Sequence, residues 1–468
     1  MKQRKFLKIL SLLVLLSINH LYSQNGKNIF NNGRLQVSGN GRFLQFANGK
    51  PFFWLADTGW LLFSKLTRRE ADKYLGDRAQ KGFNVIQAMV IHGLPEVNAY
   101  GDSAFINDDP TKPKVTPGNS PDDPDQYDFW DHIDYIVNRA EADGIFIAMV
   151  PVWGANVRSN KINMHNAEKY ITWLAERYKD KPNIIWINGG DTRGDRNSDV
   201  WNLIGNTLHR IDPVHLITFH PFGRTRSSVW FNNEQWLSFN MFQSGHKDYS
   251  QDSPGYGEDN WKYVNDDCSK IPVKPTLDGE PSYENIPHGL HDPSQPRWHD
   301  NDVRRYAYWS VFAGACGFTY GDNAVMQMHK PGDNKGAYGV KEYWYQAIDD
   351  PGASEMKYLK MLMLSEPYFE RIPDQSVIAD SIGDRYNHIS ATRGNSYIFV
   401  YTYNGRKFKI RLGKIPGAFV YAYWFNPVNG KKTFIGKYSN KGIMLFDPPG
   451  VRKDGNDWVL ILKENKSG

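Results

Sequence analysis

The chain contains little cysteine: only Cys268 and Cys316 occur among its 468 residues. Two thiols cannot form the dense disulfide framework of a small secreted scaffold. They lie far apart in the sequence and in different predicted elements, so a single bridge and two buried free thiols both remain open. The hydrophobic share of 40% is ordinary for a folded soluble protein, which predicts a conventional apolar core.

An excess of charge of one sign is also missing, since 56 Lys and Arg face 51 Asp and Glu. The basic residues form no stripe or arginine-rich arm, so we expect no nucleic-acid partner. The one long apolar run, residues 9–18, is shorter than the roughly 20 residues of a membrane span. Basic residues precede it and the small Ser23 follows it, as in a secretory signal peptide. We therefore expect a signal peptide over residues 1–23, cleavage near Ser23, a periplasmic or secreted protein, and no membrane span.

Aromatic residues are abundant, at 14% of the chain. They are good core material. Their rings also cover the apolar C–H faces of sugars. Composition alone leaves a large aromatic core and a sugar-binding surface equally open.

Short apolar runs alternate with amphipathic stretches between residues 52 and 322. The eight runs cover residues 52–57, 84–91, 145–153, 184–191, 216–223, 237–245, 275–282 and 316–322. The intervening stretches 67–82, 129–144, 166–182 and 199–213 have a helical apolar period, and Thr67 with Glu70 predicts a capping box. No glycine-rich phosphate loop follows the first run, which argues against a dinucleotide-binding sheet. Eight such units predict the α/β class, as a (β/α)₈ TIM barrel over residues 24–370.

The pattern changes near residue 371, where alternating residues and Gly or Asn turns replace the helical period. This predicts an all-β sandwich domain of seven or eight short strands over residues 371–468. The Asn404-Gly405 pair predicts a hairpin between the strands on either side of it.

Active sites of such barrels lie at the carboxyl ends of the strands. Position alone therefore selects a set of candidate catalytic and substrate-binding residues. They are Asp57, Trp60, Gln87, His92, Trp153, Asn188, Asp191, Arg193, His220, Gln243, Glu280, Tyr283, Glu284 and Asp322. The set contains no Gly-x-Ser-x-Gly serine, no cysteine and no strand-end lysine, so the chemistry should depend on carboxylates.

Asp191 and Glu280 follow strands 4 and 7, which face each other across a barrel. Glycosidic cleavage needs one carboxyl group as proton donor and another as nucleophile or base. A separation of about 5–5.5 Å predicts retention, and one of roughly 6.5–9.5 Å predicts inversion. Glu284, in the same loop as Glu280, is the alternative nucleophile.

A metal site built from His92, His220 and His246 with Asp57 or Asp322 is a second interpretation. No His-x-His follows the first strand and no bridging Lys or Glu follows the fourth. We therefore expect neither a metal nor another cofactor, and assign these histidines to sugar hydroxyls or loop carbonyls.

Three stretches resemble the apiosidase-like glycoside hydrolases of family 140. They are "GKPFFWLADTGWLLFSKLTRREADKYLGDRAQKGFNVIQ", "NIIWINGGDTRGD" and "TLDGEPSYENIP", and the resemblance runs from about residue 32 to about 370. The tail, with "YWFNPVNGK" and "FIGKY", is similar to a small β domain labelled as collagen-binding, a label from which we infer no collagen binding.

The resemblance implies a retaining hydrolase for D-apiose linkages in the side chains of rhamnogalacturonan II, a pectin. It implies an Asp after strand 4 as acid/base and a Glu after strand 7 as nucleophile, roles that fall on Asp191 and Glu280. Related barrels more often carry Asn-Glu where Asp191 stands. An Asp side chain is one methylene shorter than Glu, so whether it reaches the leaving oxygen stays an open question at this point. A hydrolase for another plant glycan and a catalytically silent glycan-binding protein remain as alternatives. We expect a monomer that acts on a pectic saccharide.

Pectic side chains hang from galacturonate, so cationic groups should face the cleft. Arg193, Arg196, Arg224 and Arg226 follow strands 4 and 5. Arginine can hold a carboxylate through two parallel hydrogen bonds. We therefore expect at least one of the four to point into the cleft.

Overall fold

The computed structural model describes residues 29–251 and 254–464. Eight parallel strands form a barrel, and each corresponds to one of the apolar runs of the sequence. They are β4 (Trp54–Thr58), β5 (Val85–Ile91), β6 (Phe146–Val152), β7 (Ile184–Thr192), β8 (Ile217–Pro221), β10 (Asn240–Gln243), β11 (Thr276–Asp278) and β12 (Gly317–Tyr320). The predicted TIM-like barrel is confirmed.

The barrel sheet runs in the order β8-β7-β6-β5-β4-β12-β11-β10, and the short β9 (Thr225–Arg226) adds antiparallel to β10. Strands β12 and β4 pair in parallel, with Gly317 opposite Trp54. The Ser238 amide donates to the Ile217 carbonyl at 2.8 Å, and this hydrogen bond closes the barrel between β8 and β10. All strand ends that carry candidate residues therefore open on the same face.

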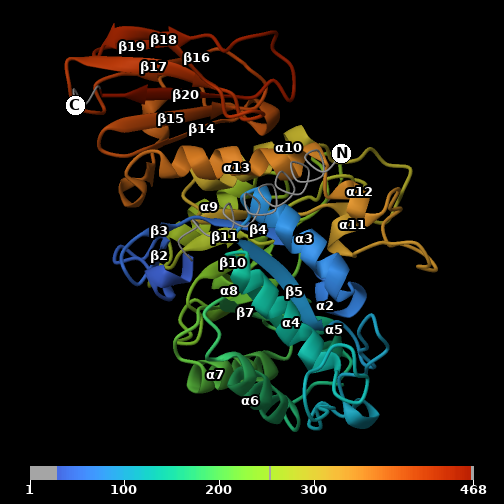
Figure 1. Cartoon of the computed structure of the whole chain (residues 1–468). Coiled ribbons are helices and arrows are strands. Elements are labelled where there is room, and N and C mark those ends of the chain that lie inside the picture. The colour runs from blue at the N-terminus through green and yellow to red at the C-terminus, as the bar shows by residue number, and fades with distance from the viewer. Residues whose placement is uncertain (1–28, 252–253, 465–468) are drawn as a thin grey trace, which may run out of the picture.

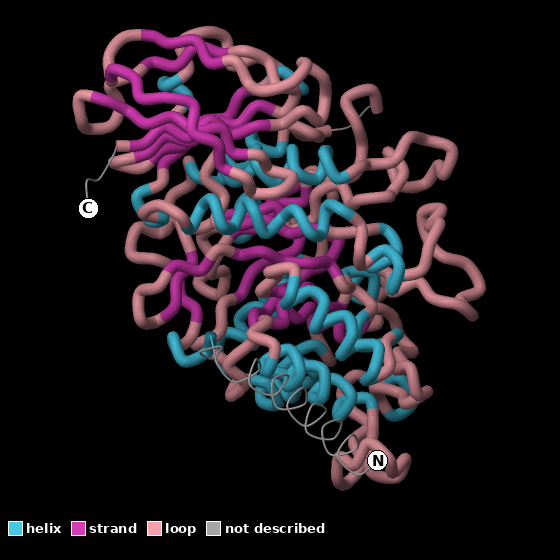
Figure 2. The backbone as a smooth tube through the Cα atoms, turned by 45° about the horizontal axis from the view of Figure 1, so that its top comes forward, coloured by secondary structure: helices cyan, strands magenta, loops and turns pink. Residues whose placement is uncertain are grey.

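Helices surround the barrel strands, as the tube view shows (Figure 2). The predicted helices are confirmed, and Thr67 and Glu70 form the predicted capping box. The longer helices are α3 (Arg68–Gln80), α4 (Phe129–Ala142), α6 (Ala167–Tyr178), α7 (Ser198–Ile211), α9 (Asn260–Cys268), α10 (Asp300–Phe312) and α13 (Pro351–Leu364). The short ones are α2 (Leu62–Lys65), α5 (Gly154–Arg158), α8 (Ser228–Phe231), α11 (Asn323–Met326) and α12 (Trp344–Ala347).

A small antiparallel sheet precedes the barrel. It consists of β1 (Leu35–Val37), β2 (Leu44–Phe46) and β3 (Pro51–Phe52). Phe46 and Phe52 pack with Phe146 at the start of β6, with ring centroids 6.4 and 5.3 Å from it. This sheet therefore lies at the amino ends of the barrel strands, away from the face that opens to substrate.

The C-terminal part is a β sandwich of eight strands within the described residues. One layer has the order β13-β14-β15-β20-β17-β18 and the other pairs β16 with β19. Their bounds are β13 (Ile372–Pro373), β14 (Ile389–Arg393), β15 (Tyr397–Thr402), β16 (Phe408–Arg411), β17 (Phe419–Phe425), β18 (Lys432–Ser439), β19 (Ile443–Phe446) and β20 (Trp458–Lys463).

The predicted hairpin at Asn404-Gly405 is wrong. β15 pairs with β14 and β20, whereas β16 pairs with β19 in the other layer. The turn therefore carries the chain from one layer to the other instead of folding it back on its neighbour.

Helices α10 and α13 lie between the barrel and the sandwich (Figure 1). Arg304 on α10 binds Asp457 of the sandwich through Nε and Nη2, at 3.0 and 3.1 Å. The same guanidinium binds Glu355 on α13. The two parts of the chain are thus joined by buried ion pairs as well as by apolar packing.

Cys268 and Cys316 are free thiols in the structure, as in the second of the two interpretations, but only Cys316 is fully buried. The expected signal peptide falls on residues outside the described ones. Within the described ranges, none of the helices combines the length and apolar character required to cross a membrane.

Candidate active site

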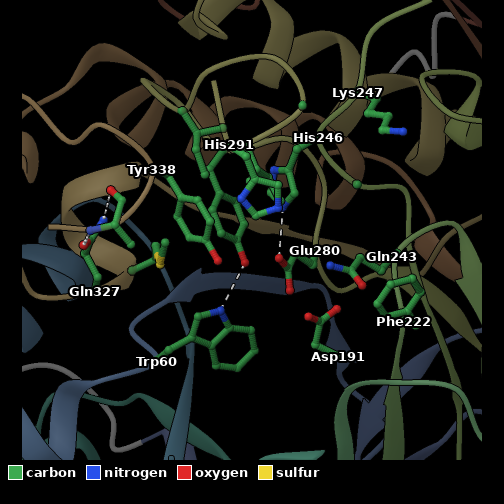
Figure 3. Close-up of a pocket in the computed structure, with 18 of the residues that line it drawn as sticks. Trp60, Asp191, Phe222, Gln243, His246, Lys247, Glu280, His291, Gln327 and Tyr338 are labelled. Carbon is green, nitrogen blue, oxygen red and sulfur yellow. Dashed lines mark hydrogen bonds and ion pairs between the residues drawn. The ribbon is translucent and has the colours of Figure 1, made fainter. Parts of the chain in front are cut away.

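A cavity of about 620 Å³ opens at the carboxyl ends of the barrel strands. Aromatic rings, histidines and two carboxylates line it (Figure 3). Of the residues named from the sequence, those in its wall are Trp60, His92, Trp153, Asp191, Arg224, Gln243, His246, Glu280 and Tyr283. The position rule thus brought together both carboxylates of the predicted pair.

Asp191 lies in an irregular end of β7, where the register shifts between Gly189 and Thr192. Gly189, Gly190 and Asp191 all have positive φ, at 89°, 107° and 46°. A Cβ on Gly190 would lie 2.4 Å from the Trp153 ring. Glycine is therefore required where the backbone passes the ring and turns the next carboxyl group into the cavity.

The pKa of the Asp191 carboxyl group is raised above its ordinary value. Burial raises its pKa first, and the negative charge of Glu280 raises it further. Its backbone amide donates to Nδ1 of His220 at 3.3 Å, and Arg158 donates to its carbonyl at 3.0 Å. Two hydrogen bonds therefore hold the backbone of Asp191 in place.

Glu280 follows β11 and lies between two imidazoles. Nε2 of His246 is 3.0 Å from its Oε1, and Nε2 of His220 is 3.2 Å from its Oε2. Burial alone would raise the pKa of Glu280, but the hydrogen bonds and charge of the two histidines outweigh it and lower the pKa to about 2. The two carboxyl groups face each other in the cavity (Figure 3), and their pKa values are shifted in opposite directions.

Aromatic rings form the wall beside this pair. The Trp60 and Trp153 ring centroids are 5.2 Å apart, and Trp60 Nε1 donates to the Tyr283 hydroxyl at 3.2 Å. The Tyr283 ring in turn packs edge-on against His246, with centroids 4.9 Å apart. These contacts fix the rings around the carboxylates before any sugar enters.

Three predicted residues are buried under the cavity instead of lining it. Asp57 accepts hydrogen bonds from Tyr74 and Arg78, both at 2.6 Å. Gln87 donates to the Gly279 carbonyl at 2.9 Å, next to Glu280, and Asn188 donates to the Trp201 carbonyl at 2.8 Å. These partners make the three side chains structural, and Gln87 supports the loop that carries Glu280.

Glu284, Asp322 and Arg193 also lie outside the cavity wall. Glu284 is buried and accepts from the Tyr320 hydroxyl at 2.6 Å, and burial raises its pKa to about 8. Asp322 caps α11 through the amides of residues 324 and 325. Arg193 is exposed and paired with an aspartate at 2.6 Å. His220 is also absent from the wall, but it contacts Glu280 from behind.

The loops contribute wall residues that the sequence analysis missed. Tyr338, from the loop between α11 and α12, has its pKa raised by burial and then by the charges of Glu280 and Asp191. Other such residues are Phe222, Lys247, Leu290, His291 and Gln327, and Met89 of β5 also lines the wall. Most of them lie beyond the strand ends in loops of irregular length, where no periodic pattern marks the inward side.

The histidines do not assemble as metal ligands. Across residues 29–251 and 254–464, no three His, Cys, Asp or Glu side chains are grouped as a metal ion would require. His220 and His246 instead contact the two oxygens of Glu280. The chemistry that this arrangement supports is acid and nucleophilic catalysis by carboxyl groups.

Comparisons with known proteins agree with this geometry. The family model "Apiosidase-like, catalytic domain" matches residues 38–370, and the model "Putative collagen-binding domain of a collagenase" matches residues 372–463. A solved glycoside hydrolase is 47% identical, with a TM-score of 0.88 over 94% of this chain and 98% of its own. A glycoside hydrolase family 5 structure from Bacteroides vulgatus ATCC 8482 is also 47% identical, with a TM-score of 0.87 over 93% of this chain and 94% of its own.

No curated protein matches the chain. The family match covers most of the barrel and includes both carboxylates of the cavity. The chain is therefore a glycoside hydrolase and belongs to the apiosidase-like family.

Proposed function

We propose that the chain is a retaining hydrolase of D-apiose linkages in the side chains of rhamnogalacturonan II, with Asp191 as acid/base and Glu280 as nucleophile. The observation that carries the catalytic assignment is that the two carboxyl groups face each other in one cavity, with pKa values shifted in opposite directions. Neighbouring carboxyl groups whose pKa values are pushed apart mark the acid and its partner.

In the first step, a carboxylate oxygen of Glu280 attacks the anomeric carbon while the Asp191 proton passes to the leaving oxygen. The glycosidic C–O bond breaks, and a glycosyl ester on Glu280 forms. In the second step, Asp191, now ionised, takes a proton from water, and the water oxygen displaces Glu280 from the sugar. His220 and His246 keep Glu280 ionised for the first step.

The choice of D-apiose rests on the family and is supported by the shape of the wall. Trp60, Trp153 and Tyr283 present ring surfaces beside the carboxylates, which suits the C–H face of a small furanose. The cavity of about 620 Å³ has room for more than one sugar. We therefore expect an oligosaccharide substrate with one sugar on each side of the cleaved bond.

The nucleophile is tested by comparing two glutamates of one loop. Glu280→Gln should reduce kcat by roughly 10³-fold or more, because an amide cannot form the glycosyl ester. Glu284→Gln should keep kcat near that of the wild type, since Glu284 bonds to Tyr320 away from the cavity. Circular dichroism checks that both variants fold. Loss of turnover in Glu284→Gln alone would show that the nucleophile is misassigned.

The substrate is tested by product analysis on a panel of pectic and hemicellulosic glycans. Release of apiose-containing products only from pectic samples supports the proposal. Activity on another plant glycan would identify a different substrate. A lack of activity on every glycan of the panel would favour a binding protein. Proton NMR of the first product decides between retention and inversion.

We also propose that the enzyme is exported and acts as a monomer. Cell fractionation should find it in the periplasm or medium, starting near residue 24. Light scattering of the purified protein should give a mass near 54 kDa less the leader. A cytoplasmic protein with an intact N-terminus would contradict the first expectation, and a dimer mass the second.

A further inference from the structure

Charge is unevenly distributed along the chain. Residues 385–446, which run from just before β14 to the end of β19, contain 11 Lys and Arg but no Asp or Glu. Within the described residues, only Arg393 and Lys407 of this segment form ion pairs, with Asp374 and Asp447. The sandwich therefore carries cationic groups that the rest of the protein does not neutralise, a feature that the overall balance of charge concealed in the sequence analysis.

The same segment has an exposed aromatic surface. Alternate residues of a strand point to one face of the sheet, and on one face of β17 they are Phe419, Tyr421 and Tyr423. Phe434 of the edge strand β18 is opposite Tyr423, with ring centroids 5.3 Å apart, and its ring is 6.4 Å from that of Tyr421. Phe419 and Phe434 are 48% and 54% exposed, although phenylalanine is usually buried. The four rings therefore form one patch that is open to solvent.

Two lysines lie among these rings. Lys437 is opposite Tyr421 in the strand pair, and its Nζ is 4.2 Å from the Phe419 ring centroid and 5.7 Å from that of Tyr421. Nζ of Lys432 is 4.9 Å from the Tyr423 ring centroid. Both lysines are exposed and belong to the unpaired cations of the segment. Rings and lysines together are called the β17–β18 face below: Phe419, Tyr421, Tyr423, Lys432, Phe434 and Lys437.

The β17–β18 face continues the surface by which the sandwich packs on the barrel. Tyr401 of β15 stacks on Tyr308 of α10, with ring centroids 4.7 Å apart. The register places Tyr401, Val459 of β20 and Phe425 of β17 in one row across the sheet. Phe425 is still buried, whereas the other end of β17 is exposed. Figure 1 shows β17 and β18 further from α10 and α13 than β14 and β15 are, so the barrel leaves this part of the sheet uncovered.

Aromatic rings interleaved with ammonium groups match the chemistry of a chain of uronic acids. Successive pyranose rings offer C–H faces for the aromatic side chains. Each sugar also carries a carboxylate, which attracts a lysine. A nucleic acid is a polyanion too, but this chain is a glycoside hydrolase, and the polymers on which it acts are glycans. The observations therefore favour an acidic polysaccharide as the partner.

We propose that the β17–β18 face binds a polyuronate chain and holds the enzyme on the polymer that carries its substrate. This goes beyond the proposed function, because it does not depend on which linkage the barrel cleaves. Once the sandwich is bound, the next encounter of the barrel with a side chain of the same polymer is intramolecular. The effective substrate concentration rises without any new contact in the catalytic cavity.

The test measures binding of the full-length protein to polygalacturonate and to its methyl ester by calorimetry at low ionic strength. The wild type should bind the acid more tightly, and added salt should weaken this binding, because the lysines are exposed. Phe419→Ala combined with Phe434→Ala should raise Kd by roughly 10-fold or more. Lys432→Gln combined with Lys437→Gln should raise it by about 3- to 10-fold.

Leu445→Ala combined with Lys409→Gln is the matched control. Leu445 is 53% exposed and lies opposite Lys409 in the other layer of the sandwich, so the control removes an apolar group and a charge from a different surface. It should bind as the wild type does. In every variant kcat/KM on a small aryl glycoside should stay unchanged, whereas on polymeric pectin it should fall together with binding. Melting curves check folding.

The proposal is overturned if the wild type does not bind polygalacturonate, binds acid and ester equally, or is unaffected by the face variants. An equal loss in the control would show that net charge, not this face, attracts the polymer. Tighter binding of single-stranded DNA or phosphatidylserine vesicles would assign the face to another class of partner. Because binding is measured without turnover, the polyuronate face stands if the apiose assignment fails, and its own failure leaves that assignment untouched.

Discussion

Asp191 and Glu280 share one cavity but are surrounded by different groups. Glu280 touches two imidazoles, whereas the strongest influences on Asp191 are burial and the charge of Glu280 itself. Ionisation of Glu280 thus helps to keep Asp191 protonated. Their different surroundings shift the two pKa values in opposite directions, as the proposed roles of acid and nucleophile require.

The pH dependence of kcat/KM should show which carboxyl group is the acid. With a pKa of about 2, Glu280 stays ionised at moderately acidic pH. Asp191, with its raised pKa, must be protonated, so activity should fall as pH rises through that pKa. Asp191→Asn should lower kcat by roughly 10²- to 10⁴-fold and remove this alkaline limb.

Aryl glycosides provide the control for that variant. A good leaving group needs little protonation, so Asp191→Asn should lose much less activity on nitrophenyl than on sugar leaving groups. An unchanged alkaline limb in the variant would assign the acid to another residue.

Strand-end position found the two carboxylates that line the cavity but could not tell which neighbouring side chains face it. Asp57 is at the end of β4, yet its carboxylate points to Arg78 and Tyr74. Glu284 is four residues after Glu280, yet it turns toward Tyr320. These orientations depend on partners from distant parts of the chain, and no local pattern encodes them.

At the scale of elements, the irregular end of β7 places the Asp191 carboxyl group in the cavity. Two glycines with positive φ precede Asp191, and the Trp153 ring lies against Gly190. Gly190→Ala should therefore move the backbone, displace the Asp191 carboxyl group and reduce kcat by about 100-fold, the effect of misplacing a catalytic group by about 1 Å.

Gly39→Ala is the matched control for Gly190→Ala. A Cβ on Gly39 would meet no heavy atom within 4 Å, so the control should keep full activity. Steady-state kinetics measures both variants, and melting curves check their folding. Full activity in Gly190→Ala would show that this turn is not what positions the acid.

The barrel strands and the sandwich strands were not equally predictable. Apolar runs alternating with capped helices specify a parallel barrel, because each run must be buried on both faces. Around Asn404-Gly405 the local turn signal is genuine, but β16 finds its partner in β19, more than thirty residues later. Pairing between layers is a non-local property, so the hairpin could not be excluded from the sequence.

At the scale of the whole molecule, the sandwich reaches toward the catalytic face. Tyr386 of the sandwich donates to Glu258 at 3.2 Å, and Glu258 also binds Arg305 on α10 at 2.6 Å. Glu258 accepts from the Tyr249 amide at 2.8 Å, in the loop that follows the cavity residue His246. The sandwich therefore braces a loop of the active site as well as covering α10.

The Arg304–Asp457 pair should make the barrel and sandwich unfold together. Both side chains are almost completely buried, with 2% and 1% exposed. Asp457→Asn removes the charge that faces Nε and Nη2 of Arg304, while Asp300 and Glu355 still pair with Nη1, so it should cost about 2 kcal/mol of unfolding free energy, the contribution of hydrogen bonds to a charged group. Calorimetry should show a lower Tm, with the sandwich beginning to melt before the barrel.

Asp447→Asn is the control for this substitution, because Asp447 pairs with Lys407 on the surface, where 58% and 64% of the two side chains are exposed. Such a pair contributes about 1 kcal/mol or less, so this variant should melt close to the wild type. A similar small shift in both variants would mean that apolar packing on α10 and α13, rather than the buried charges, holds the sandwich to the barrel.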